Sequence, residues 1–99
     1  MKLNEIKGYE LLVKAILSVE NEDECAALIE DLMTIKEIND MAQRMLVAKL
    51  LSEQTVYNKI VEETGASTAT ISRVNRALNY GEDGYRIVID KLGKELSDE

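Results

Sequence analysis

The sequence predicts an all-α protein, a single domain of six helices over residues 1–99. The chain contains no proline, and Leu, Ala, Glu and Lys, which favour helices, are frequent in it. Apolar residues recur at steps of three and four, the spacing of one helical face. We find no alternating strand pattern, no internal repeat and no low-complexity linker.

The first two helices are predicted from apolar spacing and an N-cap signal. A first helix should cover residues 4–19. Asn21 followed by Glu24 is typical of an N-cap, so a second, short helix should run through Leu32. The apolar positions of the first helix are Ile6, Tyr9, Leu12, Val13, Ile16 and Leu17.

The third helix carries the longest continuous pattern in the chain. Thr34 and Glu37 match a capping box, in which each side chain bonds the other residue's backbone amide. The helix should end near Ser52. Its stripe consists of Ile35, Ile38, Met41, Ala42, Met45, Leu46 and Lys49.

Two short helices separated by a tight turn follow. Thr55 is the expected N-cap of a fourth helix over residues 56–64, and Gly65 is a natural left-handed stop. Ser67 or Thr68 should cap a fifth helix that ends near residue 80. The last helix is predicted from Tyr85, Val88, Ile89, Leu92 and Leu96.

Composition argues against several function classes. The chain has no histidine and no Gly-rich phosphate loop, and its carboxylates are scattered along amphipathic segments, so we expect no enzyme. Cys25 is the single cysteine, cannot form an internal disulfide and is expected to be at least half-buried. The beginning of the sequence lacks the apolar core of a signal peptide, and no apolar run could cross a membrane. We therefore expect a cytoplasmic protein.

Residues 55–80 have the layout of a helix-turn-helix, the motif whose second helix enters the DNA major groove. Packing of its two helices requires apolar or small residues on the inner side. These are Ile60, Val61, Ala66, Ile71 and Val74. The remaining side of the second helix should meet double-stranded DNA, since hydroxyls and arginines suit phosphates and base edges. The candidate DNA-binding residues are Ser67, Thr68, Ala69, Thr70, Ser72, Arg73 and Arg76.

Charge is the main argument against DNA binding. The chain carries a formal net charge of −7. The excess of acidic residues lies outside the helix-turn-helix, however. The formal charges sum to +1 over residues 55–80, to −5 over residues 1–54 and to −3 over residues 81–99. We therefore expect few phosphate contacts per subunit, which dimerisation would double.

Residues 32–78 resemble the Trp repressor family, and the whole chain is similar to its TrpR-like YerC/YecD subfamily. The resemblance rests on the Leu-x-Thr segment at Leu32, on Arg44 within AQR, and on GASTATISR at residues 65–73. It implies an intertwined homodimer with the helix-turn-helix units as reading heads. It also implies a repressor. Asn58 and Val61 stand where that family carries basic phosphate-contacting residues.

The same resemblance suggests an effector site. In the family, L-tryptophan lies between two arginines, which match Arg44 and Arg73, and Thr34 matches a residue near its amino group. Val74 replaces the glycine against which the indole packs. One interpretation makes Val74 ordinary core that fills the cavity; the other keeps a site for a smaller or differently shaped effector. No cofactor is certain.

The sequence thus predicts a homodimeric, sequence-specific DNA-binding transcriptional regulator. A second hypothesis is an acidic helical protein-interaction module that has kept the fold without specific DNA binding. The negative net charge of the chain favours this second hypothesis. The hydroxyl-rich, net-basic second helix of the helix-turn-helix, called the reading helix below, favours the first.

Overall fold

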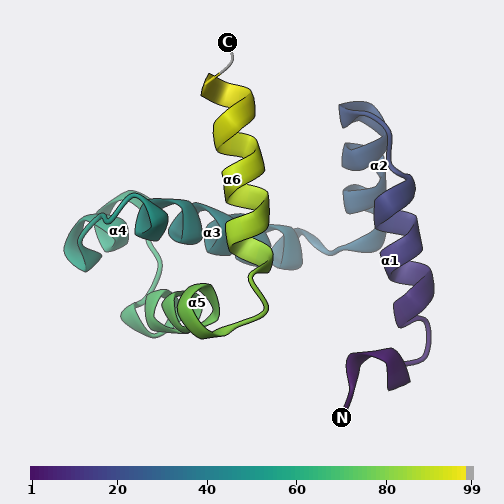
Figure 1. Cartoon of the computed structure of the whole chain (residues 1–99), viewed down its shortest axis with the longest axis horizontal. Helices are drawn as coiled ribbons and strands as arrows, with labels where there is room; N and C mark the ends of the chain where they lie inside the picture. The colour runs from purple at the N-terminus through teal and green to yellow at the C-terminus, as the bar shows by residue number, and fades with distance from the viewer. Residues whose placement is uncertain (98–99) are drawn as a thin grey trace. The chain divides into compact units, whose positions relative to one another are not determined.

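The computed structural model describes the backbone of residues 1–97 and the side chains of residues 1–93. These residues form six α-helices, one short 3₁₀ helix and connecting turns, with no strand in this part of the chain (Figure 1). The all-α prediction is confirmed. The chain divides into two compact units, Met1–Lys36 and a second unit that begins at Glu37, and each is described by itself.

The first unit contains the 3₁₀ helix η1 (Leu3–Glu5) and the helices α1 (Tyr9–Ser18) and α2 (Glu22–Leu32). The prediction of one helix over residues 4–19 is wrong at its start. Gly8 has a left-handed φ of 89°, a conformation that no α-helix continues through, so α1 begins only after it. The cap of α2 is confirmed, because the Glu24 amide donates to Asn21 Oδ1 at 2.9 Å.

Several large apolar side chains are exposed on the first unit. Neither α1 nor α2 contains a buried residue. On α1, Leu11 is 73% exposed, Ile16 57% and Leu17 77%. Cys25 is also exposed, which corrects the expectation that it is half-buried or buried. The apolar stripe of α1 is therefore left without cover in a single chain.

The long helix α3 (Ile35–Ser52) starts at the end of the first unit and continues through the second. It ends where the sequence predicts. Its buried residues are Val47 and Ala48, both 0% exposed, whereas Met41, Met45 and Leu46 of the predicted stripe are 37–44% exposed. Most of the predicted stripe is therefore exposed in the single chain, although Ile38 within it is half-buried.

The second unit continues with α4 (Tyr57–Thr64), α5 (Thr68–Tyr80) and α6 (Gly84–Ser97). Thr55 does not cap α4. Its amide donates to the Leu50 carbonyl, and the N-cap residue is Val56, without a side-chain bond. Leu96, predicted on the last helix, lies outside the described side chains. The core of this unit consists of Val47, Ala48, Ile60, Ala66, Ile71 and Val74.

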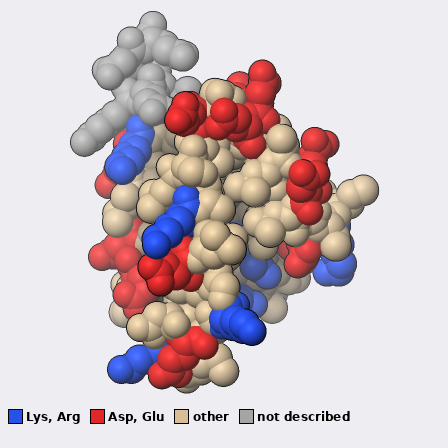
Figure 2. All heavy atoms as spheres, turned by 90° about the vertical axis from the view of Figure 1, so that its right-hand side faces the viewer, with Lys and Arg blue, Asp and Glu red and all other residues tan. Residues whose placement is uncertain are grey.

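Charged side chains are distributed widely over the surface. Figure 2 shows Asp and Glu side chains spread among uncharged surface on one face, with fewer Lys and Arg side chains between them. None of the described helices is both long enough and apolar enough to cross a bilayer.

Candidate nucleic-acid interface

Gly65 forms the turn between α4 and α5. Its φ of 71° is left-handed, and its amide donates to the Val61 carbonyl at 2.8 Å, which ends α4 as predicted. Thr64 closes the turn from the other side. Its Oγ1 donates to the Ile60 carbonyl at 2.7 Å and accepts from the Ala66 amide at 3.0 Å. The turn is therefore held by side-chain as well as backbone bonds.

Gln43 of α3 also holds this turn. Its Nε2 donates to the Thr64 carbonyl at 3.2 Å in a half-buried position. The bond satisfies one of the carbonyls that the end of α4 leaves without a helical partner. Sequence reasoning missed Gln43, because a bond between residues 21 positions apart leaves no local pattern.

The start of α5 is defined by Ser67. Its side chain accepts a hydrogen bond from the Thr70 amide at 3.1 Å, and its hydroxyl donates to Thr70 Oγ1 at 3.1 Å. Of the two cap candidates, Ser67 is the N-cap. The free amides of the first helical turn then carry the positive end of the helix dipole, which attracts phosphate.

The inner side of the motif is packed as predicted except at one position. Ile60, Ala66, Ile71 and Val74 are each at most 2% exposed. Val61, predicted to face inward, is 36% exposed, so that prediction is wrong. Ile60 and Val61 are neighbours on a helix and point about 100° apart, so one of them can face the core fully while the other cannot.

The outer side of α5 carries small and basic side chains. Thr68, Ala69, Ser72, Arg73 and Arg76 recur at steps of three and four, so they share one face, and all five are exposed. Ser67 is exposed beside them, and Thr70 is half-buried. A face of this kind can approach a groove closely, because its first turn carries no bulky side chain.

The helix-turn-helix carries only a small positive charge, but its arginines are accessible to an anion. On α4, Lys59 Nζ lies 3.9 Å from Glu63 Oε1 in an exposed ion pair, so the charge of Lys59 is offset by Glu63. Within the described part of the chain, neither Arg73 nor Arg76 has a carboxylate partner at salt-bridge distance. The two arginines are thus the cations that α5 can offer to an anion.

The candidate effector residues are differently placed. Arg44 is half-buried on α3, and Arg73 is exposed on α5. Val74 is 2% exposed and packs in the core cluster, so its side chain occupies the space beside α5. Thr34 is exposed in the connection before α3 and belongs to the first unit.

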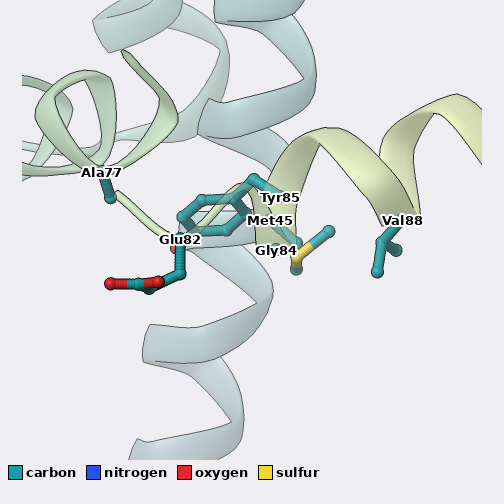
Figure 3. Close-up of a pocket in the computed structure, with 6 residues that line it drawn as sticks. All are labelled: Met45, Ala77, Glu82, Gly84, Tyr85 and Val88. Carbon is teal, nitrogen blue, oxygen red and sulfur yellow. The ribbon is translucent and has the colours of Figure 1, made fainter. Parts of the chain in front are cut away.

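A hollow of about 490 Å³ opens on the second unit (Figure 3). Its lining is mostly apolar and comes from α3, the end of α5, the turn after it and the start of α6. Figure 3 shows the Glu82 carboxylate pointing away from Met45 and Val88. None of the candidate effector residues lines it. The lining residues are Met45, Ala77, Glu82, Gly84, Tyr85 and Val88.

Comparison with known proteins assigns this architecture to a family. The family model described as Trp repressor protein matches residues 7–93. The chain belongs to the Trp repressor family. The match includes α1 to α5 and most of α6, so the family assignment covers the helix-turn-helix and the helices around it.

Individual members of the Trp repressor family resemble the chain along nearly its whole length. YerC of Bacillus subtilis (strain 168), an uncharacterized protein, is 49% identical over 93% of this chain and 90% of its own. A TrpR-like protein from Eubacterium eligens is 53% identical, with a TM-score of 0.85 over 91% of this chain and 95% of that one. A proposed Trp repressor from Staphylococcus aureus is 42% identical, with a TM-score of 0.84 over 94% and 95%.

Proposed function

We propose that this protein is a homodimeric, sequence-specific DNA-binding transcriptional regulator that acts as a repressor. The observation that carries the proposal is the α4–Gly65–α5 motif. Its inner side is buried, its outer side carries exposed hydroxyls and two arginines, and it belongs to a chain of the Trp repressor family. This is the arrangement that a helix needs in order to enter a major groove.

Within the motif, the exposed residues of α5 divide into two roles. Thr68, Ala69 and Ser72 are small and approach base edges. Arg76, one helical turn after Ser72, contacts a DNA phosphate or a guanine. Arg73 contacts the neighbouring DNA backbone. Ser67 and Thr70 start the helix and present its amides to a phosphate.

Homodimerisation accounts for the apolar surface of the single chain. Monomeric proteins rarely expose large apolar patches, and many large apolar side chains are exposed here, among them Leu17 at 77% and Ile35 at 80%. In an intertwined pair, the first unit and the exposed stripe of α3 would become shared core. The two units would then be parts of one domain, and two motifs would read half-sites about 34 Å apart.

We infer that L-tryptophan does not control this reading head. Val74 is buried in the core cluster and leaves no bare backbone for an indole ring. DNA binding by this chain is therefore expected without added effector, with Arg44 and Arg73 free of a ligand carboxylate.

Selection of bound sequences from a random DNA library tests the proposal. Purified protein should enrich one palindromic sequence at low and at moderate salt. Ala at Thr68 should relax one base position of that sequence. Arg76→Ala should weaken binding and, if Arg76 contacts phosphate, lower the salt slope by about 2, one for each copy in the dimer. Lys91→Ala, on the exposed part of α6, is the charge-matched control and should leave the sequence preference unchanged.

The rival hypothesis, an acidic protein-interaction module, rests on the formal net charge of −7. It predicts that no sequence is enriched at either salt concentration. It also predicts that Thr68→Ala and Arg76→Ala leave the residual DNA affinity equal to that of wild type. Either result would remove the reading-head proposal.

A further inference from the structure

The C-terminal end of α5 is tied to α6 by the side chain of Arg86. Arg86 lies in the first turn of α6. Its Nε donates to the Leu78 carbonyl at 3.0 Å, and its Nη2 donates to Asn79 Oδ1 at 3.0 Å. One planar guanidinium therefore bonds two consecutive residues of the preceding helix, which fixes direction as well as distance.

The network extends along α5. Asn79 Nδ2 donates to both the carbonyl and Oδ1 of Asn75 at 3.0 Å. Asn75 adjoins Arg76, the arginine on the exposed face. A guanidinium at the C-terminus of α5 is also favoured by the helix dipole, whose negative end lies there.

The backbone of the turn between α5 and α6, next to the Arg86 hydrogen bonds, is conformationally restricted. Asp83 has a left-handed φ of 66°, and the Gly81 amide donates to the Ala77 carbonyl at 2.9 Å. A Cβ at Gly81 would meet that same carbonyl oxygen. The start of α6 is anchored in turn, since Tyr85 and Ile89 pack against the core cluster.

Apolar packing restricts the angle of α5 but leaves it a range of about 20°. Its inner face is held by Ile71, Val74 and Leu78, each at most 4% exposed, but hydrophobic contact is non-directional. The directed bonds between α5 and the rest of the unit determine how far the helix can roll or tilt. At its C-terminal end, those bonds come from Arg86.

We propose that Arg86 is a positioning residue for DNA recognition, which sets the orientation of α5 by clamping its C-terminal end to α6. The inference rests on the proposed function, because orientation matters only if α5 reads DNA. Arg86 itself need not touch DNA. Its loss is therefore expected to weaken specific binding through the geometry of the reading helix.

The first test compares Arg86→Gln with Lys91→Gln, which removes one positive charge from the same helix. Arg86→Gln should weaken specific DNA binding about 10-fold and lower the melting temperature by about 5 °C. Arg86→Lys keeps the charge but not the two-pronged donor, and should recover only part of the affinity. Lys91→Gln should change the affinity less than twofold. Equal affinity of Arg86→Gln and wild type, or full recovery by Arg86→Lys, would overturn the proposal.

The second test needs no DNA. It separates failure of the Arg86 proposal from failure of the proposed DNA-binding function. Residual dipolar couplings of the DNA-free protein report the angle between α5 and α3. Arg86→Gln should change the couplings of α5 relative to α3, and Lys91→Gln should not. Unchanged couplings overturn the clamp whatever the DNA result is. If wild type binds no specific DNA while the couplings change, the clamp stands and the proposed function fails.

Discussion

At the scale of single residues, Val74 places a β-branched side chain at the centre of the second unit, among Ile60 and Ile71. It is 2% exposed. The resemblance to the Trp repressor family implies that Val74 replaces a glycine. In that family the indole of L-tryptophan packs against the bare backbone of this glycine. Under the proposed function, the side chain that completes the core also removes the space for the ligand, and one substitution tests both consequences.

Val74→Gly should lower the free energy of unfolding by about 3 kcal/mol, because it opens a cavity and places glycine within a helix. Val61→Gly is the matched control. Val61 is 36% exposed on α4, so its loss should cost only about 1 kcal/mol, through helix propensity and the partly buried side chain together. Denaturant unfolding at one protein concentration measures both, and equal losses would contradict the burial of Val74.

Titration calorimetry with L-tryptophan addresses the ligand. Wild type should release no binding heat, because Val74 fills the space beside α5. Val74→Gly opens that space and is the variant in which weak binding is expected. Micromolar binding of L-tryptophan by wild type would show that the pocket is open despite Val74.

At the scale of elements, two glycines border α5 for different reasons. Gly65 has a φ of 71° with nothing within 4 Å of its Cβ position, so only its backbone conformation disfavours a side chain. Gly81 has an ordinary φ of −89°, but a Cβ there would meet the Ala77 carbonyl oxygen. One position is restricted by conformation and the other by space.

Gly65→Ala should therefore cost about 1 kcal/mol of stability, and Gly65→Asn less, because Asn tolerates the left-handed region. Gly81→Ala and Gly81→Asn should both cost about 2 kcal/mol, since any Cβ forces the backbone of the α5–α6 corner to move. Unfolding midpoints of the four variants measure this difference. A full rescue by Asn at Gly81 would contradict the steric explanation.

At the scale of the whole molecule, few large side chains among residues 1–93 are buried. The buried core lies in the second unit, while apolar residues along α1, α3 and α6 are exposed in the single chain. A 99-residue chain buries only part of its unfolded surface, so the partner in the proposed dimer would contribute much of the stability by covering these residues.

Sedimentation velocity should accordingly give twice the chain mass of 11.1 kDa, about 22 kDa. Leu17→Glu should shift the protein toward monomer at micromolar concentration, because Leu17 is 77% exposed in one chain and buried in the proposed dimer. Ser18→Glu adds the same charge at the neighbouring position and is the control. A monomeric wild type would remove the dimer from the proposal.

The sequence by itself determined the features that depend on residues a few positions apart. The Gly65 turn, the Ser67 cap and the Asn21 cap follow from local hydrogen bonds and allowed backbone angles, which neighbouring residue types control. The helix-turn-helix was predicted for the same reason. Gly8 shows the limit, because an apolar pattern continues past it while its backbone does not.

Only the tertiary structure decided which apolar residues are buried and which distant groups are bonded. Val47 and Ala48 are buried while most of the predicted stripe of α3 is exposed, and Val61 is exposed beside buried Ile60. Gln43 and Arg86 bond carbonyls at the ends of α4 and α5. The physical reason is the same in each case. Amphipathic spacing shows that a helix has an apolar side, but the side that is buried depends on the elements that pack against it.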